Sequence, residues 1–207
     1  MTKIKICGIT NRDDALHACG CGADALGFVF YDKSPRCIAP AAAREIIATL
    51  PPFVTAVGLF VNEAPRRVRQ VADFCGLGVI QLHGDEGPQG CDFAPYRVVK
   101  ALRVRDGESL ARAGDYRVAA LLLDAWVPGT YGGTGHTFNW RLAATVAKER
   151  SVILAGGLTP ENVAEAVAAV DPYAVDVSSG VEVAPGKKDP EKVAAFIRNA
   201  KAVAHRA

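Results

Sequence analysis

Near its start, the chain contains Lys3-Ile4-Lys5-Ile6-Cys7-Gly8-Ile9-Thr10, which has the pattern of a short strand followed by a loop. Similar short strands, each followed by a helical stretch, recur along the chain. The basic and apolar residues of this first segment alternate, which predicts a β-strand over Ile4–Cys7. Gly8 interrupts the strand, and a helical pattern begins soon after, at Arg12. A thiol at such a strand end is placed for chemistry if the fold is a parallel α/β barrel. If the strand merely runs into a core, Cys7 is an ordinary small hydrophobic residue.

The same alternation of short apolar runs and longer amphipathic stretches continues along the chain. Strands that alternate with helices are typical of βαβ units in a parallel sheet, and nearly continuous apolar strands indicate a sheet covered on both faces. The predicted strands are Ile4–Cys7, Ala25–Phe30, Ala56–Phe60, Val79–Leu82, Val98–Ala101, Ala119–Asp124, Val152–Leu154 and Ala174–Val177. The predicted helical stretches are Arg12–Cys19, Ala41–Leu50, Pro65–Cys75, a weak one near Gly87–Phe93, Ser109–Ala113, Trp140–Lys148, Pro160–Val170 and Pro190–Val203.

Eight such repeats within 207 residues favour a closed (β/α)8 (TIM) barrel of the α/β class, with residues 1–207 forming a single domain. An open, doubly wound sheet is the alternative. The first strand lacks the Gly-x-Gly-x-x-Gly motif that would indicate dinucleotide binding in such a sheet. Helix caps are predicted at Thr10 or Asn11, at Thr159 before Pro160, and at Asp189 before Pro190.

The composition argues against several classes of protein. Hydrophobic residues make up 50% of the chain and the net charge is +2, which disfavours both disorder and a basic nucleic-acid-binding surface. No apolar run approaches the ~20 residues that span a membrane, and no signal-peptide pattern is present. The six cysteines form no Cys-x-x-Cys pair, and none stands at zinc-ligand spacing from a histidine. We therefore expect a reduced, cytoplasmic protein with no metal, cofactor, membrane or nucleic-acid partner.

The active site of a barrel lies at the carboxyl ends of its strands, so polar residues at these positions are candidates. Asp124 ends an apolar strand, where a buried carboxylate needs a partner. Arg36 follows the second strand, where its guanidinium can hold a carboxylate or a phosphate. Either residue could instead be solvated, and His83 could be a structural histidine. The other polar residues near strand ends are expected to be packing or positioning groups (Asn62, Gln81) or solvated (Lys100, Arg103).

Two glycine-containing segments, Gly156-Gly157 and Ser178-Ser179-Gly180, follow the last two predicted strands. Glycine lets backbone N–H groups approach a ligand closely, and free N–H groups at the start of a short helix bind phosphate. Loops at these positions often form a phosphate site in this fold, although both could be simple tight turns. We therefore predict a phosphorylated small molecule as the ligand. The long segment Ala125–Asn139 is predicted to be an active-site loop or lid, with a disordered surface loop as the alternative.

Seven motifs, in order along the chain, match a known pattern. They are Lys5–Thr10, Gly27–Phe30 with Ser34–Arg36, Val57–Asn62, Gln81–Glu86, Asp124 with Gly132–Gly135, Leu154–Leu158, and Asp176–Glu182 with Pro185–Asp189. Together they resemble the phosphoribosylanthranilate isomerase family. The resemblance implies a cofactor-free (β/α)8 barrel that performs an Amadori rearrangement in tryptophan biosynthesis. The reaction converts N-(5-phosphoribosyl)anthranilate to 1-(2-carboxyphenylamino)-1-deoxyribulose 5-phosphate.

The resemblance also implies roles for individual residues. Asp124 is the expected general acid, which protonates the furanose ring oxygen, and Cys7 is the expected general base, which removes the C2′ proton. Arg36 matches the contact to the anthranilate carboxylate. The phosphate cradle is matched by Gly156, Gly157, Ser178, Ser179 and Gly180, and further candidates for substrate binding are Gln81, His83 and Asp176. The oligomeric state is open, with a monomer slightly favoured.

Three alternative functions stay open. The histidine-pathway isomerase performs the same rearrangement on a larger substrate. That family is known for a barrel with aspartates at both catalytic positions and with two phosphate sites, whereas this chain has Cys7 at the first position and no glycine-rich phosphate loop in its first half. A phosphosugar epimerase or aldolase is more distant, and an aldolase needs a Schiff-base lysine at a strand end. Lys100 is the candidate for that lysine, and this function leaves Cys7 without a role. A non-catalytic binder of a phosphorylated ligand would not need both Cys7 and Asp124.

Overall fold

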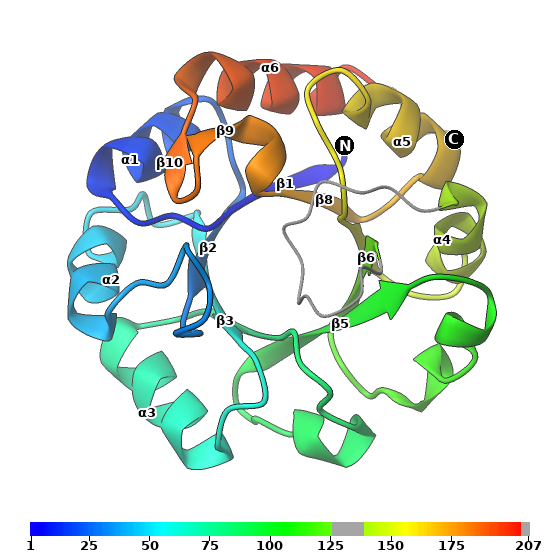
Figure 1. Ribbon diagram of the computed structural model, residues 1–207, viewed down its shortest axis with the longest axis horizontal. Helices are drawn as coiled ribbons and strands as arrows, with labels where there is room; N and C mark the ends of the chain where they lie inside the picture. The colour runs from blue at the N-terminus through cyan, green and yellow to red at the C-terminus, as the bar shows by residue number, and fades with distance from the viewer. Residues whose placement is uncertain (126–138, 204–207) are drawn as a thin grey trace.

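Eight parallel strands close into a barrel that is surrounded by helices (Figure 1). The structure is a computed structural model, and it describes residues 1–125 and 139–203. β1 pairs in parallel with β2 on one side and with β8 on the other, so the sheet closes on itself. The predicted (β/α)8 barrel is confirmed, and the open, doubly wound sheet is wrong. The strands are β1 (Lys3–Cys7), β2 (Ala25–Val29), β3 (Thr55–Phe60), β4 (Val79–Leu82), β5 (Arg97–Val104), β6 (Ala120–Ala125), β7 (Val152–Leu154) and β8 (Ala174–Val177).

The helices of the outer layer turn their apolar sides to the barrel. In α3, for example, the buried residues are Val68, Val71, Ala72 and Cys75, which follow the i, i+3, i+4, i+7 spacing of one helix face. The α-helices are α1 (Arg12–Gly20), α2 (Pro40–Ile47), α3 (Pro65–Cys75), α4 (Trp140–Ala147), α5 (Val163–Val170) and α6 (Pro190–Lys201). A short hairpin of β9 (Glu182–Ala184) and β10 (Lys187–Lys188), which the sequence pattern did not predict, lies between β8 and α6.

Two predicted helices, near Gly87–Phe93 and over Ser109–Ala113, are only short 3-10 turns. The first is η1 (Pro88–Cys91), and the second segment overlaps the end of η2 (Glu108–Leu110) and the first residue of η3 (Ala113–Asp115). Glycines in or beside both segments disfavour an α-helix, and so few residues cannot offset the cost of starting one. A fourth 3-10 turn, η4 (Ser179–Val181), follows β8.

Two of the three predicted helix caps are confirmed. The side chain of Asn11 accepts a hydrogen bond from the backbone N–H of Asp14, and the side chain of Asp189 accepts from those of Glu191 and Lys192. The cap at Thr159 is wrong, because α5 begins only at Val163.

The segment before α5 is instead a turn tied to the loop after β7. The Asn162 side chain accepts a hydrogen bond from the backbone N–H of Thr159 and donates one to the carbonyl of Gly157. Asn162 therefore holds the Gly156-Gly157 loop, the predicted phosphate-binding segment, in place, and the helix does not extend back to Pro160.

Alternation along the strands determines what enters the barrel. In β6, Leu121 and Leu123 pack in the core beneath the helices, whereas Leu122 packs in a separate cluster inside the barrel. Because side chains two apart in a strand share a face, Asp124 also points into the barrel. The same rule places Lys5 and Cys7 of β1 inside, because the intervening Ile4 and Ile6 pack in the outer core.

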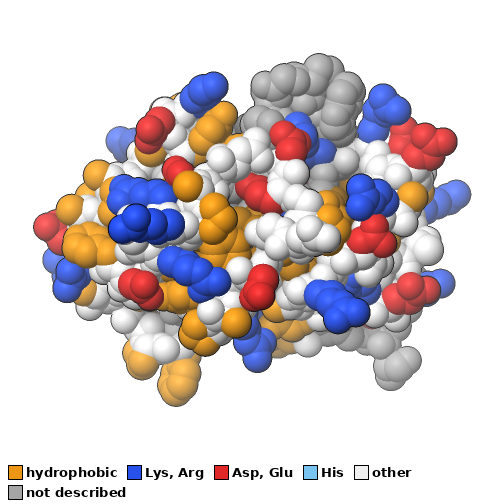
Figure 2. All heavy atoms as spheres, turned by 90° about the horizontal axis from the view of Figure 1, so that it is seen from below, with side chains coloured by type: hydrophobic (Ala, Val, Ile, Leu, Met, Phe, Trp, Pro, Cys, Tyr) orange, Lys and Arg blue, Asp and Glu red, His pale blue; other side chains and the backbone are white. Residues whose placement is uncertain are grey.

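The outer surface carries mixed charge. On the face shown in Figure 2, Lys and Arg side chains are interspersed with Asp and Glu side chains. Among the helices of the described residues, none is long and apolar enough to cross a membrane.

Candidate active site at the carboxyl ends of the strands

Five of the predicted site residues are buried at one end of the barrel. Cys7 ends β1, Gln81 lies in β4, Asp124 in β6 and Asp176 in β8, and His83 directly follows β4. Each of the five is less than a tenth exposed. Strands of both halves of the chain therefore bring their polar side chains into one interior space, as the barrel fold predicts.

The thiol of Cys7 lies in a small apolar cluster with Val29, Leu59 and Val61. Gly27, its partner residue in β2, makes room for it, since a Cβ atom on Gly27 would lie 2.7 Å from the sulfur. Burial raises the pKa of the Cys7 thiol, and the neighbouring Lys5 ammonium opposes that rise. The surroundings of Cys7 thus contain both an apolar wall and a positive charge.

Asp124 is held by a chain of hydrogen bonds that starts in β4. The amide Nε2 of Gln81 lies 3.1 Å from Nδ1 of His83, and in this orientation of the amide Nδ1 accepts and Nε2 is the donor nitrogen of the imidazole. That nitrogen lies 3.2 Å from Oδ2 of Asp124 and donates to it. His83 therefore orients Oδ2 of Asp124 and makes no hydrogen bond with the other carboxylate oxygen, Oδ1.

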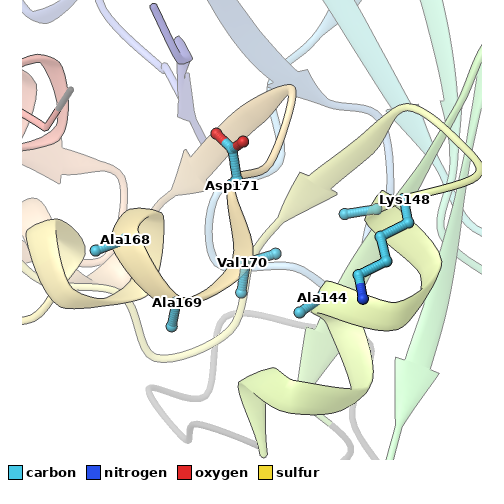
Figure 3. A pocket seen from close by; sticks show the side chains of 7 residues that line it. Ala144, Lys148, Ala168, Ala169, Val170 and Asp171 are labelled. Carbon is cyan, nitrogen blue, oxygen red and sulfur yellow. The ribbon is translucent and has the colours of Figure 1, made fainter. Parts of the chain in front are cut away.

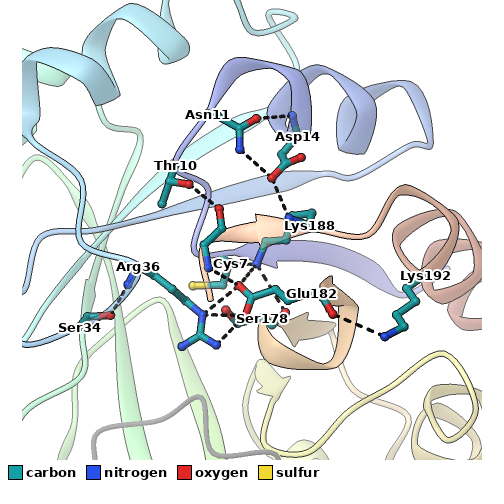
Figure 4. Close-up of polar contacts among 11 residues, drawn as sticks. Cys7, Thr10, Asn11, Asp14, Ser34, Arg36, Ser178, Glu182, Lys188 and Lys192 are labelled. Carbon is teal, nitrogen blue, oxygen red and sulfur yellow. Dashed lines mark hydrogen bonds and ion pairs between the residues drawn. The ribbon is translucent and has the colours of Figure 1, made fainter. Parts of the chain in front are cut away.

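Arg36 is fixed by Glu182 of the β9–β10 hairpin (Figure 4). Its Nε and Nη2 atoms donate to the carboxylate over 2.9 Å and 2.6 Å. Oε1 of this carboxylate accepts from Nε of Arg36 and also from Lys188, the latter over 2.7 Å. Lys188 donates to the backbone carbonyl of Cys7 as well. Glu182 and Lys188 lie in a matched motif, but the sequence assigned no role to either of them.

The loops after β7 and β8 meet at the same end of the barrel. Gly156 and Gly157 have φ angles of 84° and 62°, which only glycine adopts readily. Gly180 lies so close to the carbonyl of Leu158 that a Cβ atom would overlap it. The hydroxyl of Ser178 is buried, and among the described residues it has no hydrogen-bond partner. The two predicted phosphate-binding segments are therefore brought together.

The expectation that Lys100 is solvated is wrong. Its side chain is 2% exposed, and Nζ donates to Glu86 and to the carbonyl of Gly84, each over 2.7 Å. Lys100 points outward from β5, because its strand neighbours Val99 and Ala101 face the barrel interior. It therefore ties down the loop after β4 and does not offer an amine to the barrel interior.

Arg103 and Asn62 join the same loop. Arg103 is partly exposed and pairs with Asp85, and Asn62 accepts a hydrogen bond from the backbone N–H of Asp85. The expectation of a positioning role for Asn62 agrees with this contact.

A pocket of about 260 Å³ lies elsewhere, between α4 and α5 (Figure 3). Its lining is mostly alanine and also contains Lys148 and Asp171, and it includes none of the predicted site residues. Within residues 1–125 and 139–203, no three His, Cys, Asp or Glu side chains gather as metal ligands. Most of the predicted loop Ala125–Asn139 lies outside the described residues.

Comparison with known proteins identifies the family. A family model described as N-(5′-phosphoribosyl)anthranilate (PRA) isomerase matches residues 4–199. The chain belongs to this isomerase family. A family member from Trichlorobacter lovleyi is 60% identical over 202 residues, which are 97% of this chain and 98% of that protein. One from Pelobacter propionicus is 58% identical over 97% of this chain and 96% of its own length.

Solved structures of the isomerase family have the same barrel. The Thermotoga maritima phosphoribosyl anthranilate isomerase matches with a TM-score of 0.92 and 47% identity, covering 98% of this chain and 100% of that one. A structure of a phosphoribosyl anthranilate isomerase in complex with reduced 1-(o-carboxyphenylamino)-1-deoxyribulose 5-phosphate matches at 0.89 and 46% identity, with the same coverage. The family, the fold and the isomerase activity predicted from the sequence are confirmed.

Proposed function

We propose that the chain converts N-(5-phosphoribosyl)anthranilate to 1-(2-carboxyphenylamino)-1-deoxyribulose 5-phosphate, with Cys7 as general base and Asp124 as general acid. The observation that carries this assignment is that both side chains are buried inside the barrel at its carboxyl end, on strands β1 and β6. The isomerisation needs one group that donates a proton and one that removes a proton. A thiol and a carboxyl group that enter the same space from different strands supply this pair.

The two proton transfers follow in order. The Asp124 carboxylic acid protonates the furanose ring oxygen, and the C1′–O bond breaks as the nitrogen electron pair forms an iminium ion. The Cys7 thiolate then removes the C2′ proton, and the C–H electron pair forms the enolamine. The enolamine takes up a proton at C1′ as its C2′ hydroxyl loses one, which gives the ketone. Oδ1 of Asp124 suits the first step, because His83 occupies Oδ2. Gly156 keeps the space beside Oδ1 free, since a Cβ atom there would lie 2.8 Å from it.

Arg36 is the proposed partner of the anthranilate carboxylate. Glu182 engages Nε and Nη2, and among the described residues Nη1 has no acceptor, so this end of the guanidinium can bind a second carboxylate. The phosphate is proposed to bind between the loops of Gly156-Gly157 and Ser178-Ser179-Gly180. The buried, unpartnered Ser178 hydroxyl supports this assignment, because it lacks an acceptor that a phosphate oxygen would supply.

Gln81, His83 and Asp176 are proposed to act at the same site in different ways. Oε1 of Gln81 is buried without a partner among the described residues and is available to accept from a sugar hydroxyl. His83 contacts Asp124, and Asp176 pairs with Lys5. We therefore propose that His83 and Asp176 affect the reaction mainly through these neighbours.

Fluorescence tests the proposed function. Freshly prepared N-(5-phosphoribosyl)anthranilate loses its anthranilate fluorescence as it is converted, and we expect the purified protein to accelerate that loss. A protein that binds the reduced product analogue but gives no turnover would be a non-catalytic binder, and the proposed reaction would be wrong.

Three further properties predicted from the sequence stay predictions: a cytoplasmic location, a single domain over residues 1–207, and a monomer. A Thermotoga maritima relative with 45% identity has been described both as dimeric and as generated monomers. Light scattering of the purified chain at several concentrations distinguishes the monomer from a dimer.

A further inference from the structure

A buried ion pair inside the barrel has no part in the two proton transfers. Nζ of Lys5 lies 2.7 Å from Oδ1 of Asp176, and the two side chains are 5% and 9% exposed. Lys5 and Asp176 are register partners in the neighbouring strands β1 and β8. Removing two charges from water is costly, and packed hydrophobic residues often stabilise a core equally well. The presence of this pair next to the thiol therefore calls for a role other than stability.

The ammonium of Lys5 and the thiol of Cys7 occupy the same small space. The two residues are two apart in β1, so their side chains lie on the same face of the strand. Gly27 of β2 is the register partner of Cys7 and also lies close to the Lys5 ammonium. A Cβ atom on Gly27 would lie 2.7 Å from the sulfur and 3.0 Å from Nζ of Lys5. A side chain at Gly27 would therefore crowd both the sulfur and the ammonium.

We propose that Lys5 is a positioning residue that favours the thiolate form of Cys7 against the effect of burial, and that Asp176 limits this effect by sharing the same ammonium. The proposal rests on the proposed function, since it explains how Cys7 becomes a base. A thiolate accepts the C2′ proton, whereas a thiol cannot. The Lys5 ammonium stabilises the negative sulfur before the substrate proton arrives, and the carboxylate of Asp176 fixes the position of that ammonium.

The charges around Cys7 agree with this arrangement. Burial raises the pKa of the Cys7 thiol and Asp176 adds to the rise, while Lys5 and Lys188 lower the pKa without outweighing the burial. Lys188 donates to the backbone carbonyl of Cys7 and to Glu182, which also binds Arg36. Lys5 therefore offers the positive charge that is not shared with the hairpin.

The other neighbours of Cys7 add little charge. Beside Cys7, β2, β3 and the loops after them contribute the apolar residues Val29, Leu59 and Val61 and the half-buried Tyr31. Two further polar residues at this end of the barrel, Asp124 and His83, bond to each other. Burial alone would lower the pKa of Lys5, but Asp176 and Cys7 outweigh it and raise it to about 12. The side chain of Lys5 is therefore protonated at neutral pH.

The opposite charges of the pair give the proposal a directional test. Lys5→Met removes the positive charge, so the pKa of Cys7 should rise. Asp176→Asn removes the negative charge and keeps the ammonium, so the same pKa should fall. If the ion pair only fills space in the barrel, the two substitutions should not shift the pKa of Cys7 in opposite directions. Lys100→Met is a matched control, because Lys100 is equally buried and ion-paired but points away from the barrel interior.

The measurement uses the full-length protein without substrate. Iodoacetamide reacts with the thiolate, so the rate of Cys7 alkylation is followed against pH, and mass spectrometry of the Cys7 peptide separates it from the other cysteines. We expect the midpoint for Lys5→Met to move up by about one to three pH units, which is typical for the loss of an adjacent opposite charge. The midpoint should move down for Asp176→Asn and stay in place for Lys100→Met.

A shift of Lys5→Met and Asp176→Asn in the same direction, or no shift in either, overturns the proposal. If Lys5→Met does not fold, Asp176→Asn decides alone, and an unchanged or raised midpoint rejects the proposal. Because no substrate is present, this result is independent of turnover. Loss of the proposed function would appear in the fluorescence assay instead.

Discussion

Arg36 in the loop after β2 and Glu182 in β9 are 146 residues apart in the chain and form an ion pair through two guanidinium nitrogens, Nε and Nη2. The Glu182 carboxylate is almost fully buried and also binds Lys188, which in turn donates to the backbone of Cys7. The hairpin therefore connects the proposed carboxylate-binding residue with the strand that ends in the proposed base.

Loss of the Glu182 charge should weaken substrate binding more than it slows the chemistry. Glu182→Gln keeps the shape of the side chain but removes the charge that aims Arg36. A hydrogen bond to a charged group contributes ~1.5–3 kcal/mol, so we expect KM to rise by at least about tenfold with a smaller change in kcat. Steady-state kinetics of the isomerisation measures both. Glu45→Gln, an exposed glutamate in α2, should leave KM unchanged, and an equal loss of kcat in Glu182→Gln would argue against a binding role.

Replacement of either proton-transfer group should abolish most of the activity. General acid or base catalysis contributes about 10²- to 10⁴-fold, so Cys7→Ser and Asp124→Asn should each lower kcat by a factor in this range. Both substitutions keep the size of the side chain, and circular dichroism should show an unchanged fold. Cys19→Ser, in α1 outside the site, should retain full activity. Normal turnover by Cys7→Ser would refute the assignment of the base.

The sequence predicted the strands and the inward residues because both depend on local patterns. Asp124 ends a run of apolar residues, and a period of two along β6 is enough to place it inside the barrel once the sheet is known to close. The partner of Arg36 could not be predicted in this way, because no local pattern links it with Glu182.

Lys100 illustrates a second limit of sequence reasoning. A lysine near a strand end is usually solvated, but here the loop after β4 folds over it and supplies two acceptors. The acceptors are contributed by a tertiary contact, and neither the period of the strand nor the residue type reveals it. The late start of the helix that was predicted to begin at Pro160 has a similar origin, because the side chain of Asn162 bonds to the loop before it.

The contact between the loops after β7 and β8 predicts a specific effect on phosphate binding. A methyl group in Gly180→Ala would overlap the carbonyl of Leu158 and push the two loops apart. We expect KM for the phosphorylated substrate, and the inhibition constant for inorganic phosphate, to rise by about tenfold, which corresponds to ~1.4 kcal/mol of binding free energy.

Gly107→Ala is the matched control for this substitution. A Cβ atom on Gly107 would have no atom within 4 Å among its described surroundings, so neither constant should change. If Gly180→Ala bound inorganic phosphate as tightly as the wild type, phosphate would not bind between these loops.

The charge of Glu182 should also make the stability of the protein depend on pH. Burial works to raise the pKa of Glu182, but its contacts with Arg36 and Lys188 outweigh this effect and lower the pKa below the usual value. A carboxyl group with a lowered pKa in the folded protein stabilises it above the pKa of the unfolded chain, ~4.3, and this stabilisation is lost as the pH falls through the folded value. Wild type should therefore be more stable than Glu182→Gln at neutral pH, and the difference should shrink below about pH 4. Urea denaturation at a series of pH values measures the difference in unfolding free energy. Glu45→Gln should have the stability of the wild type at every pH. If the difference between wild type and Glu182→Gln stays constant down to strongly acid pH, the Glu182 charge does not stabilise the fold.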